Sequence, residues 1–245
     1  MKWGYIVDDK GRLLSQLNLS IKSHCHALIT GGSGSGKSWT ILYLLGCLLQ
    51  DTPEIEVHFC DFKKSSELSF LQGYKYFYSG NECYEGIMEY YNSFCEVRES
   101  GNAKRRCALI FDEFPAFINY LTMRDKQEKT KKASDALGAI AEILMLGRGT
   151  GKGYGVWIVT QRADASLFVN GARDNFMITV GLGRMSKEQK GMLFVGEDIP
   201  NKVFRTGEGC ILADGYPLQL VAYPKIKNMV DWKKHIKAIL MSNSD

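Results

Sequence analysis

The sequence lacks the features that mark membrane-spanning and disulfide-stabilised proteins. It contains no run of about 18 apolar residues and no N-terminal signal pattern, so no segment is predicted to span a membrane. Its seven cysteines are odd in number and include no C-x-x-C pair, which favours free thiols in a reducing compartment over a disulfide framework. Repeats, low-complexity runs and linkers are also missing. We therefore expect a cytoplasmic protein whose residues 1–245 form one domain.

The composition is that of an ordinary globular protein. Apolar residues make up 45% of the chain and charged residues 24%, which is enough to bury a sizeable core. The formal net charge of +4 permits a polyanionic partner without requiring one. His24, Cys25 and His26 are adjacent, but neighbours on an extended segment point to opposite faces, so these three side chains do not converge on one metal ion.

A glycine-rich stretch carries the strongest chemical signal. Residues 31–38 fit the pattern G-x-x-x-x-G-K-[ST], the phosphate-binding loop of P-loop nucleoside triphosphatases. Glycines let the backbone curl until several N–H groups point at a triphosphate. Lys37 would reach the β- and γ-phosphates, and the Ser38 hydroxyl would hold Mg²⁺. The expected nucleotide-binding residues are Gly31, Gly32, Ser33, Gly34, Ser35, Gly36, Lys37, Ser38 and Trp39.

The residues on both sides of the loop support this interpretation. Residues 27–30 form a short apolar run that predicts a buried strand, and residues 39–50 predict a mostly buried helix. A strand, the loop and a helix in this order are the context that the motif requires. The alternative, a glycine-rich surface turn that happens to contain Lys and Ser, does not explain the flanking apolar segments.

Two further strands end in polar residues of the kind that ATP hydrolysis uses. The apolar run at 107–111 ends in Asp112 and Glu113, and in open α/β sheets ligands bind at the carboxyl ends of strands. Asp112 would complete the Mg²⁺ shell, and Glu113 would orient or deprotonate the attacking water. The run at 156–160 ends in Gln161, which is either a surface residue or a sensor of the γ-phosphate.

Residues 122–132 contain five basic and two acidic residues without an apolar period. We expect an exposed, mobile loop. From this segment alone, a solvated connector and a loop that contacts polyphosphate are equally good interpretations. Residues 147–153 alternate glycine with polar residues and predict a flexible turn that presents Arg148.

The other segments complete an α/β pattern with a mostly parallel central sheet. An N-terminal hairpin is expected in residues 1–24, an α/β core in 25–222 and an amphipathic tail helix in 223–245. Within the core we expect strands at 55–60, 74–78 and 176–180, helices at 81–98, 133–145 and from 186, and a closing hairpin at 209–221.

Together the motifs resemble the motor domain of FtsK/SpoIIIE-type DNA translocases, within the FtsK–HerA group of P-loop ATPases. Five stretches carry the resemblance: residues 26–38, Asp61 to Lys63, residues 109–113, Thr160 to Arg162, and residues 207–212. The resemblance implies a RecA-like P-loop NTPase fold, in a ring whose pore holds duplex DNA. The membrane segments and the sequence-reading winged-helix module of long family members are absent from this sequence. A separate replication, transfer or packaging protein would therefore orient the DNA.

The resemblance also assigns roles to basic residues. A neighbouring subunit would supply an arginine to the γ-phosphate, and Arg98, Arg148 and Arg173 are candidates. Arg148 is favoured because glycines flank it, although its spacing to Thr160 departs from the family pattern by about two residues. The resemblance favours DNA contact for residues 122–132. The expected contacts are Arg124, Lys126, Lys129, Lys131 and Lys132.

The sequence thus predicts an ATP- and Mg²⁺-dependent pump of duplex DNA for a mobile element, virus or plasmid, and the resemblance implies a hexamer. Two alternatives remain. Type VII secretion ATPases resemble the same group, although they usually join several such domains. A small-molecule kinase shares the phosphate loop, but the strand endings at Asp112, Glu113 and Gln161 favour hydrolysis.

Overall fold

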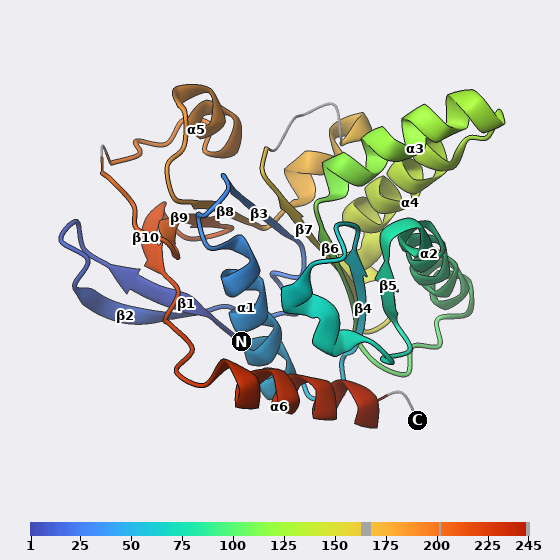
Figure 1. Cartoon of the computed structure of the whole chain (residues 1–245), viewed down its shortest axis with the longest axis horizontal. Helices are drawn as coiled ribbons and strands as arrows, with labels where there is room; N and C mark the ends of the chain where they lie inside the picture. The colour runs from blue at the N-terminus through green and yellow to red at the C-terminus, as the bar shows by residue number, and fades with distance from the viewer. Residues whose placement is uncertain (163–167, 201, 244–245) are drawn as a thin grey trace.

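The computed structural model describes residues 1–162, 168–200 and 202–243, and in this range ten strands form one mixed sheet (Figure 1). Its central part is parallel, as the continuous apolar runs of the sequence predict. In spatial order the parallel strands are β8 (Ile178–Leu182), β3 (Ala27–Gly31), β7 (Tyr154–Thr160), β6 (Cys107–Asp112), β4 (Glu56–Asp61) and β5 (Phe77–Ser79). The predicted α/β class with a mostly parallel sheet is confirmed.

The two predicted hairpins extend this sheet on one side. β9 (Glu208–Ala213) pairs antiparallel with β8, and β10 (Gln219–Ala222) pairs antiparallel with β9. The N-terminal hairpin of β1 (Lys2–Val7) and β2 (Leu13–Asn18) then adds to β10, with Tyr5 opposite Ala222. Residues from the two ends of the chain therefore meet in one sheet.

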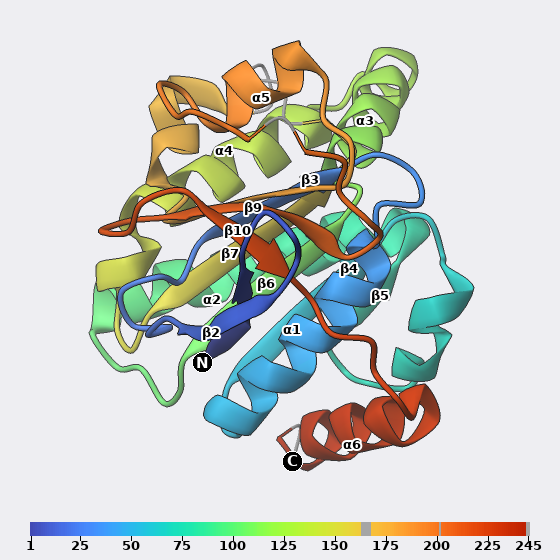
Figure 2. The ribbon, with the colours of Figure 1, turned by 90° about the vertical axis from the view of Figure 1, so that its left-hand side faces the viewer.

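Helices cover both faces of the sheet (Figure 2). Alternate residues of β3 face opposite cores: Ala27 and Ile29 belong to one hydrophobic cluster and Leu28 to the other. One face carries α1 (Lys37–Asp51), α6 (Met229–Ser242) and the 3₁₀ segment η1 (Ser66–Leu71). The other carries α2 (Cys83–Ser100), α3 (Phe114–Glu128) and α4 (Lys132–Leu146).

The tail helix α6 packs closely on α1 because α1 has a glycine at the crossing. A Cβ on Gly46 would lie 2.2 Å from the ring of Trp232, and the Trp232 indole N–H donates to the Leu42 carbonyl at 2.9 Å.

The capping box that the sequence predicts at Ser186 opens α5 (Lys187–Leu193), where Ser186 and Gln189 cap each other reciprocally. Short 3₁₀ segments occupy Gly80–Glu82 (η2), Gly147–Gly149 (η3) and Val169–Asn175 (η5).

The expectation of a mobile loop at residues 122–132 is wrong. α3 continues to Glu128, a short turn follows, and α4 begins at Lys132. The segment lacks an apolar period because this part of α3 projects beyond the core, where no face needs to be buried (Figure 1). Met, Arg, Lys, Gln and Glu are good helix formers, and extending an existing helix is easy.

The short aromatic strand expected at residues 74–78 is β5 in the structure. β5 begins further along the chain, at Phe77, and is only 3 residues long.

Among the described residues, no helix is both long and apolar enough to cross a membrane.

Candidate nucleotide site

The pairing of the parallel strands brings the sequence motifs to one edge of the sheet. Thr30 of β3 is opposite Thr160 of β7, and Asp112 of β6 is opposite both Val159 of β7 and Asp61 of β4. The phosphate loop, the two acidic residues and Gln161 lie at the carboxyl ends of these three neighbouring strands. This edge is where open α/β sheets bind ligands.

The backbone of the phosphate loop is held in the shape that an anion requires. Gly36 has a φ of 98° and directly precedes α1, and a Cβ there would lie 2.8 Å from the Gly207 nitrogen. Gly207 donates its N–H to the Ser35 carbonyl at 2.9 Å, so the segment before β9 braces the loop. α1 has no acidic residue in its first turn, which leaves its N-terminal N–H groups and positive dipole end available to a phosphate.

A cavity of about 500 Å³ lies beside this loop. Its walls include the predicted residues Lys37, Ser38, Asp112, Glu113 and Gln161. Gly32, Ser33, Gly34, Gly36 and Trp39 line the same cavity. Ten of the residues predicted to bind nucleotide, Mg²⁺ or the attacking water thus meet in one space.

Lys37 lies along the inside of the loop. Its ammonium donates to the carbonyls of Gly31 at 2.6 Å and Gly32 at 3.1 Å. Partial burial lowers the pKa of Lys37, against the opposite influence of the Glu113 carboxylate. A nearby phosphate would supply the negative charge that this half-buried ammonium lacks.

Acidic residues gather at the ends of β4 and β6. Burial raises the pKa of Asp112 to about 6, and the neighbouring carboxylates of Glu113 and Asp61 raise it further in the same direction. Asp61 is itself buried and accepts hydrogen bonds from the Ser65 N–H at 2.7 Å and the Ser65 hydroxyl at 3.1 Å. Ser38 and Asp112 line the cavity together, and hydroxyl and carboxylate oxygens are the ligands that Mg²⁺ prefers. The donor set therefore fits a magnesium ion.

Glu113 occupies a strained and well-defined position. Its φ of 62° is in the left-handed region, which is uncommon for a residue other than glycine and is often associated with function. The side chain is buried, accepts a hydrogen bond from the Gln161 amide at 3.2 Å and pairs with the Lys63 ammonium at 2.6 Å.

Lys63 belongs to this cavity but was not among the predicted site residues. Its position directly after a strand, in the Asp61 to Lys63 segment that carries part of the family resemblance, was the available signal. The sequence does not show that β4 lies beside β6, and only that neighbourhood brings Lys63 to Glu113.

The three candidate arginines lie elsewhere, and the described residues that line the cavity include no arginine. Arg98 pairs with Glu142, and Arg173 donates to the Met192 carbonyl. Arg148, in η3, is exposed, and its side chain forms no hydrogen bond or ion pair with any residue in the described ranges. It precedes β7, at the amino edge of the sheet, and so lies at the opposite edge from the nucleotide cavity of its own chain.

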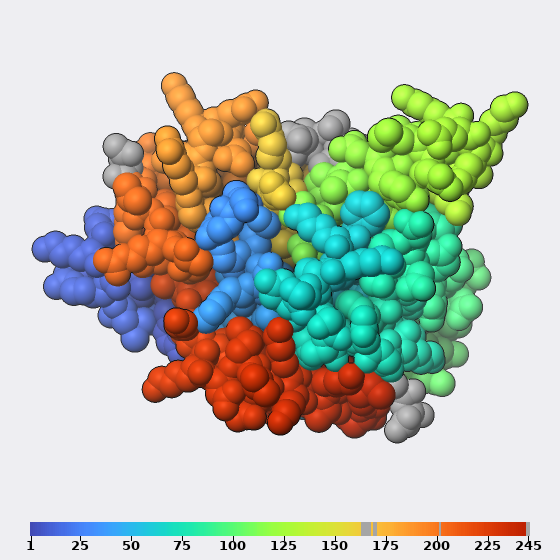
Figure 3. All heavy atoms as spheres, in the orientation of Figure 1, coloured from blue at the N-terminus to red at the C-terminus, as the bar shows by residue number. Residues whose placement is uncertain are grey.

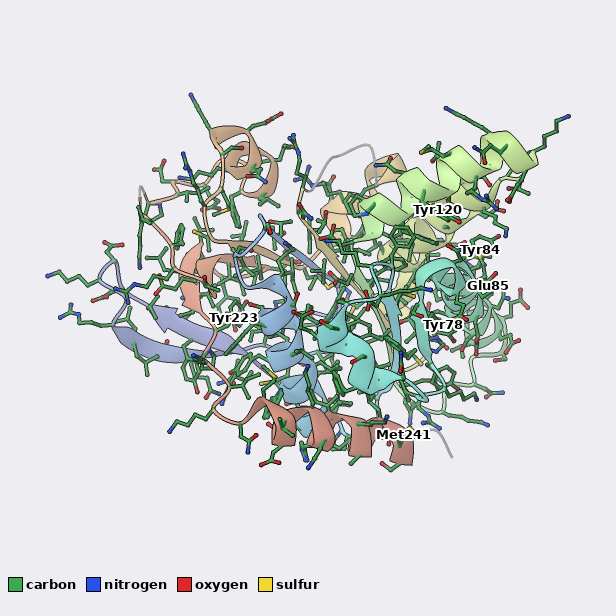
Figure 4. All side chains as sticks on the ribbon, viewed as in Figure 1. Tyr78, Tyr84, Glu85, Tyr120, Tyr223 and Met241 are labelled. Carbon is green, nitrogen blue, oxygen red and sulfur yellow. The ribbon has the colours of Figure 1, made fainter. Side chains whose placement is uncertain are left out.

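The predicted DNA-contacting residues lie on the helical arm formed by α3, α4 and the turn between them. The arm projects from the body of the molecule (Figure 3), and Tyr84 and Tyr120 lie near its base (Figure 4). Two of the five cations have contacts within the chain: Arg124 pairs with Glu128, and the Lys132 ammonium lies 5.1 Å from the Tyr84 ring centre.

The other three cations of the arm are unpaired. Lys126, Lys129 and Lys131 are exposed and have no ion pair with any residue that the structure describes. The turn that presents them is fixed by Asp125, which accepts N–H groups from Lys132 at 3.0 Å and Ala133 at 2.8 Å.

Comparisons with known proteins agree with this fold. Over 189 residues, covering 69% of this chain and 36% of the relative, the sequence is 29% identical to the FtsK domain-containing protein YdcQ of Bacillus subtilis (strain 168). The chain therefore spans about a third of that relative. No protein-family model matches the sequence.

Two solved structures are similar in fold. One is the pCW3 conjugation coupling protein TcpA, in a monomer form with ATPγS, with a TM-score of 0.69 and 16% identity over 99% of this chain and 70% of that one. The other is the cytoplasmic domain of the type VII secretion ATPase EccC from Thermomonospora curvata, with a TM-score of 0.62 and 18% identity over 98% of this chain and 30% of that one. The predicted RecA-like P-loop ATPase fold and the resemblance to FtsK-type motor domains are confirmed.

Proposed function

We propose that this FtsK-like P-loop ATPase hydrolyses ATP to move duplex DNA, with residues 1–245 acting as one motor domain. The observation that carries the proposal is the convergence of the phosphate loop, Asp112, Glu113 and Gln161 on one cavity of about 500 Å³. A kinase for a small metabolite needs the phosphate loop, but it has no need of a buried carboxylate and an amide placed together to handle a water molecule.

Each residue of the cavity has a defined task in this proposal. Lys37 and the N–H groups of the loop would bind the triphosphate, and Ser38 and Asp112 would hold Mg²⁺, which would supply positive charge to the phosphates. Glu113 accepts a proton from the attacking water. Gln161 donates to Glu113 at 3.2 Å and so lies where it can orient that water. Trp39, which lines the cavity at the start of α1, would contact the nucleotide.

The arm of α3 and α4 is the proposed contact with duplex DNA. Its free lysines are clustered and exposed, as binding to the phosphate backbone requires. TcpA, a conjugation coupling protein, shares the fold, which supports DNA as the substrate. The physiological process would be packaging, transfer or replication of a mobile element, virus or plasmid.

The proposed assembly is a ring, a hexamer by resemblance, in which each site is completed by a neighbour. The cavity has no arginine among its described lining residues, and charge developing on the γ-phosphate calls for one. Arg148 is the best candidate because it is exposed and unpaired in the described part of the chain, whereas Arg98 and Arg173 are held by other groups. Its place at the opposite edge from its own cavity requires that it act on another subunit.

The rate of ATP hydrolysis with and without duplex DNA tests the proposal. We expect duplex DNA of any sequence to stimulate hydrolysis, with the Lys37→Ala chain as the inactive control. A protein-secretion motor, the second candidate because EccC shares the fold, would hydrolyse ATP at a rate that DNA does not change. A kinase would release ADP only when an acceptor metabolite is added.

A further inference from the structure

A second and larger hollow lies at the amino edge of the sheet, opposite the nucleotide site. It has a volume of about 980 Å³ and is lined by segments that precede parallel strands. These segments are residues 18–22 before β3, 51–54 before β4, 105–106 before β6 and 148–152 before β7. We call this hollow the amino-edge groove.

Positive charge is concentrated in this groove. The chain as a whole has a formal net charge of +4. Five cationic side chains line the groove, against two carboxylates, which is a local excess of three positive charges. The cations are Lys22, Arg105, Arg106, Arg148 and Lys152, and the carboxylates are Asp51 and Glu54.

The carboxylates of the chain leave most of this charge unbalanced. Asp51 pairs with the N-terminal ammonium at 3.1 Å, so it is already neutralised. Arg105 donates to the Asn243 carbonyl at 2.6 Å and lies 3.9 Å from Glu56. Within the described ranges, Lys22, Arg106, Arg148 and Lys152 form no ion pair, and Lys152 only donates to the Lys104 carbonyl, at 2.7 Å.

Two glycines hold the basic segments together. Gly153 has a φ of 109°, and a Cβ there would lie 2.2 Å from Nη1 of Arg106. Gly151 has a φ of 56°, and its Cβ would lie 2.5 Å from that of Ala103. The turn before β7 therefore packs against the segment before β6, and the Arg106 guanidinium fits over Gly153 with Nη1 buried and without a hydrogen-bond partner. Like charges brought together by close packing need an anion to offset their repulsion.

We propose that the amino-edge groove binds the phosphate backbone of nucleic acid. The groove is about twice as large as the nucleotide cavity. With Arg148 assigned to the neighbouring active site, Lys22, Arg105, Arg106 and Lys152 still come from three separate segments, so they suit several phosphates in a row better than one small anion. Arginine and lysine bind backbone phosphates without reading the sequence. The identity of the ligand rests on the DNA substrate proposed above. The site itself is separate from the arm, because the arm follows the carboxyl end of β6 and residues 105–106 of the groove precede its amino end.

A pair of exposed lysines allows a direct test. Lys22 and Lys152 lie on different segments of the groove and are exposed, so a Lys22→Gln/Lys152→Gln chain should fold normally. The matched control is Lys10→Gln/Lys234→Gln, which removes the same charge from exposed positions outside the groove. Arg148 is left unchanged in both chains, so a role of Arg148 in the neighbouring active site does not affect the comparison.

The measurement is fluorescence anisotropy of a labelled duplex over a range of salt concentrations. Removing two phosphate contacts should weaken binding about tenfold at moderate salt and flatten the plot of log affinity against log salt by about two units of slope. The control chain should bind as the wild type does. If the wild type binds duplex DNA and the Lys22→Gln/Lys152→Gln chain matches the control chain in both affinity and salt slope, the groove proposal is wrong. The DNA substrate of the proposed function would then still stand.

Chemical footprinting gives a second readout that needs no substitution. Duplex DNA should protect Lys22 and Lys152 from acetylation while Lys10 and Lys234 remain reactive. Equal reactivity of all four lysines with and without bound duplex would also overturn the proposal. A wild-type chain that binds no duplex at all would remove the DNA substrate from the proposed function and the groove's ligand with it.

Discussion

The ammonium of Lys63 lies 2.6 Å from Oε1 of Glu113, and the two residues belong to loops that follow neighbouring strands. Glu113 is buried, whereas 46% of the Lys63 side chain is exposed. The amide of Gln161 donates to the same carboxylate oxygen at 3.2 Å. The proposed base is therefore fixed from two sides, and Lys63 balances its charge.

A double-mutant cycle should detect this pair. Lys63→Met should lower the free energy of unfolding by about 1 kcal/mol, because it leaves a buried carboxylate without its cation and the exposure of Lys63 moderates the cost. The same substitution in a Glu113→Gln background should cost much less, because no charge is left unpaired. Urea denaturation of the four proteins measures the coupling. If the two substitutions change the free energy of unfolding additively, the Lys63–Glu113 pair does not contribute to stability. Lys63→Arg serves as the charge-conserving control.

The pKa of Asp112 predicts a pH-dependent change in stability. Burial and neighbouring carboxylates raise that pKa from 3.8 to about 6, so between about pH 4 and pH 6 the folded chain keeps a proton that the unfolded chain releases. Ionisation of Asp112 therefore destabilises the folded chain. This loss of stability grows between about pH 4 and pH 6 and is complete above about pH 6. Asp112→Asn should raise the free energy of unfolding by roughly 1–3 kcal/mol at pH 7.5, yet abolish Mg²⁺-dependent hydrolysis.

Urea denaturation at pH 4 and pH 7.5, without nucleotide or Mg²⁺, checks this expectation. The gain from Asp112→Asn should nearly vanish at pH 4, where the aspartate is protonated in the folded chain. An equal difference at both pH values would contradict the assigned cause.

The sequence predicted those features that local patterns determine. The phosphate loop, Asp112, Glu113 and Gln161 each follow an apolar run, and apolar runs with strand character are visible in a sequence. Residues 122–132 were misread because the outer part of α3 has no buried face, so the apolar period that identifies a helix is missing there.

Features that depend on which strands are neighbours were not predictable. Lys63 meets Glu113 only because β4 pairs with β6. The cations of the amino-edge groove, from Lys22 to Lys152, are far apart in the sequence and meet only because three parallel strands, β3, β6 and β7, begin at the same edge.

The free lysines of the arm should contribute a sequence-independent part of DNA binding. Replacing Lys126, Lys129 and Lys131 with glutamine should weaken binding to all duplexes alike and reduce the salt slope by about one unit per lost contact. A chain with glutamine at the exposed positions 10, 187 and 234 is the control with the same net charge. An unchanged slope in the arm variant would make this turn a solvated connector between α3 and α4.

Mixed assemblies test whether the nucleotide site is shared between subunits. Lys37→Ala and Arg148→Ala chains should each be inactive alone, because one cannot bind the γ-phosphate and the other cannot complete its neighbour's site. Mixing them should restore part of the ATPase activity, since some interfaces then combine an intact Lys37 with an intact Arg148. No recovery, together with a monomeric mass in the presence of ATP and DNA, would exclude both the ring and the shared site.

Hydrolysis by the Glu113→Gln chain tests the central claim most directly. The glutamine keeps the size of the side chain but cannot accept the proton of the attacking water. The variant should bind ATP as tightly as the wild type and hydrolyse it at least ~100-fold more slowly in a single turnover, the loss that follows removal of a positioned general base. Hydrolysis at the wild-type rate would contradict the assignment of Glu113 as the base and, with it, the mechanism proposed for this site.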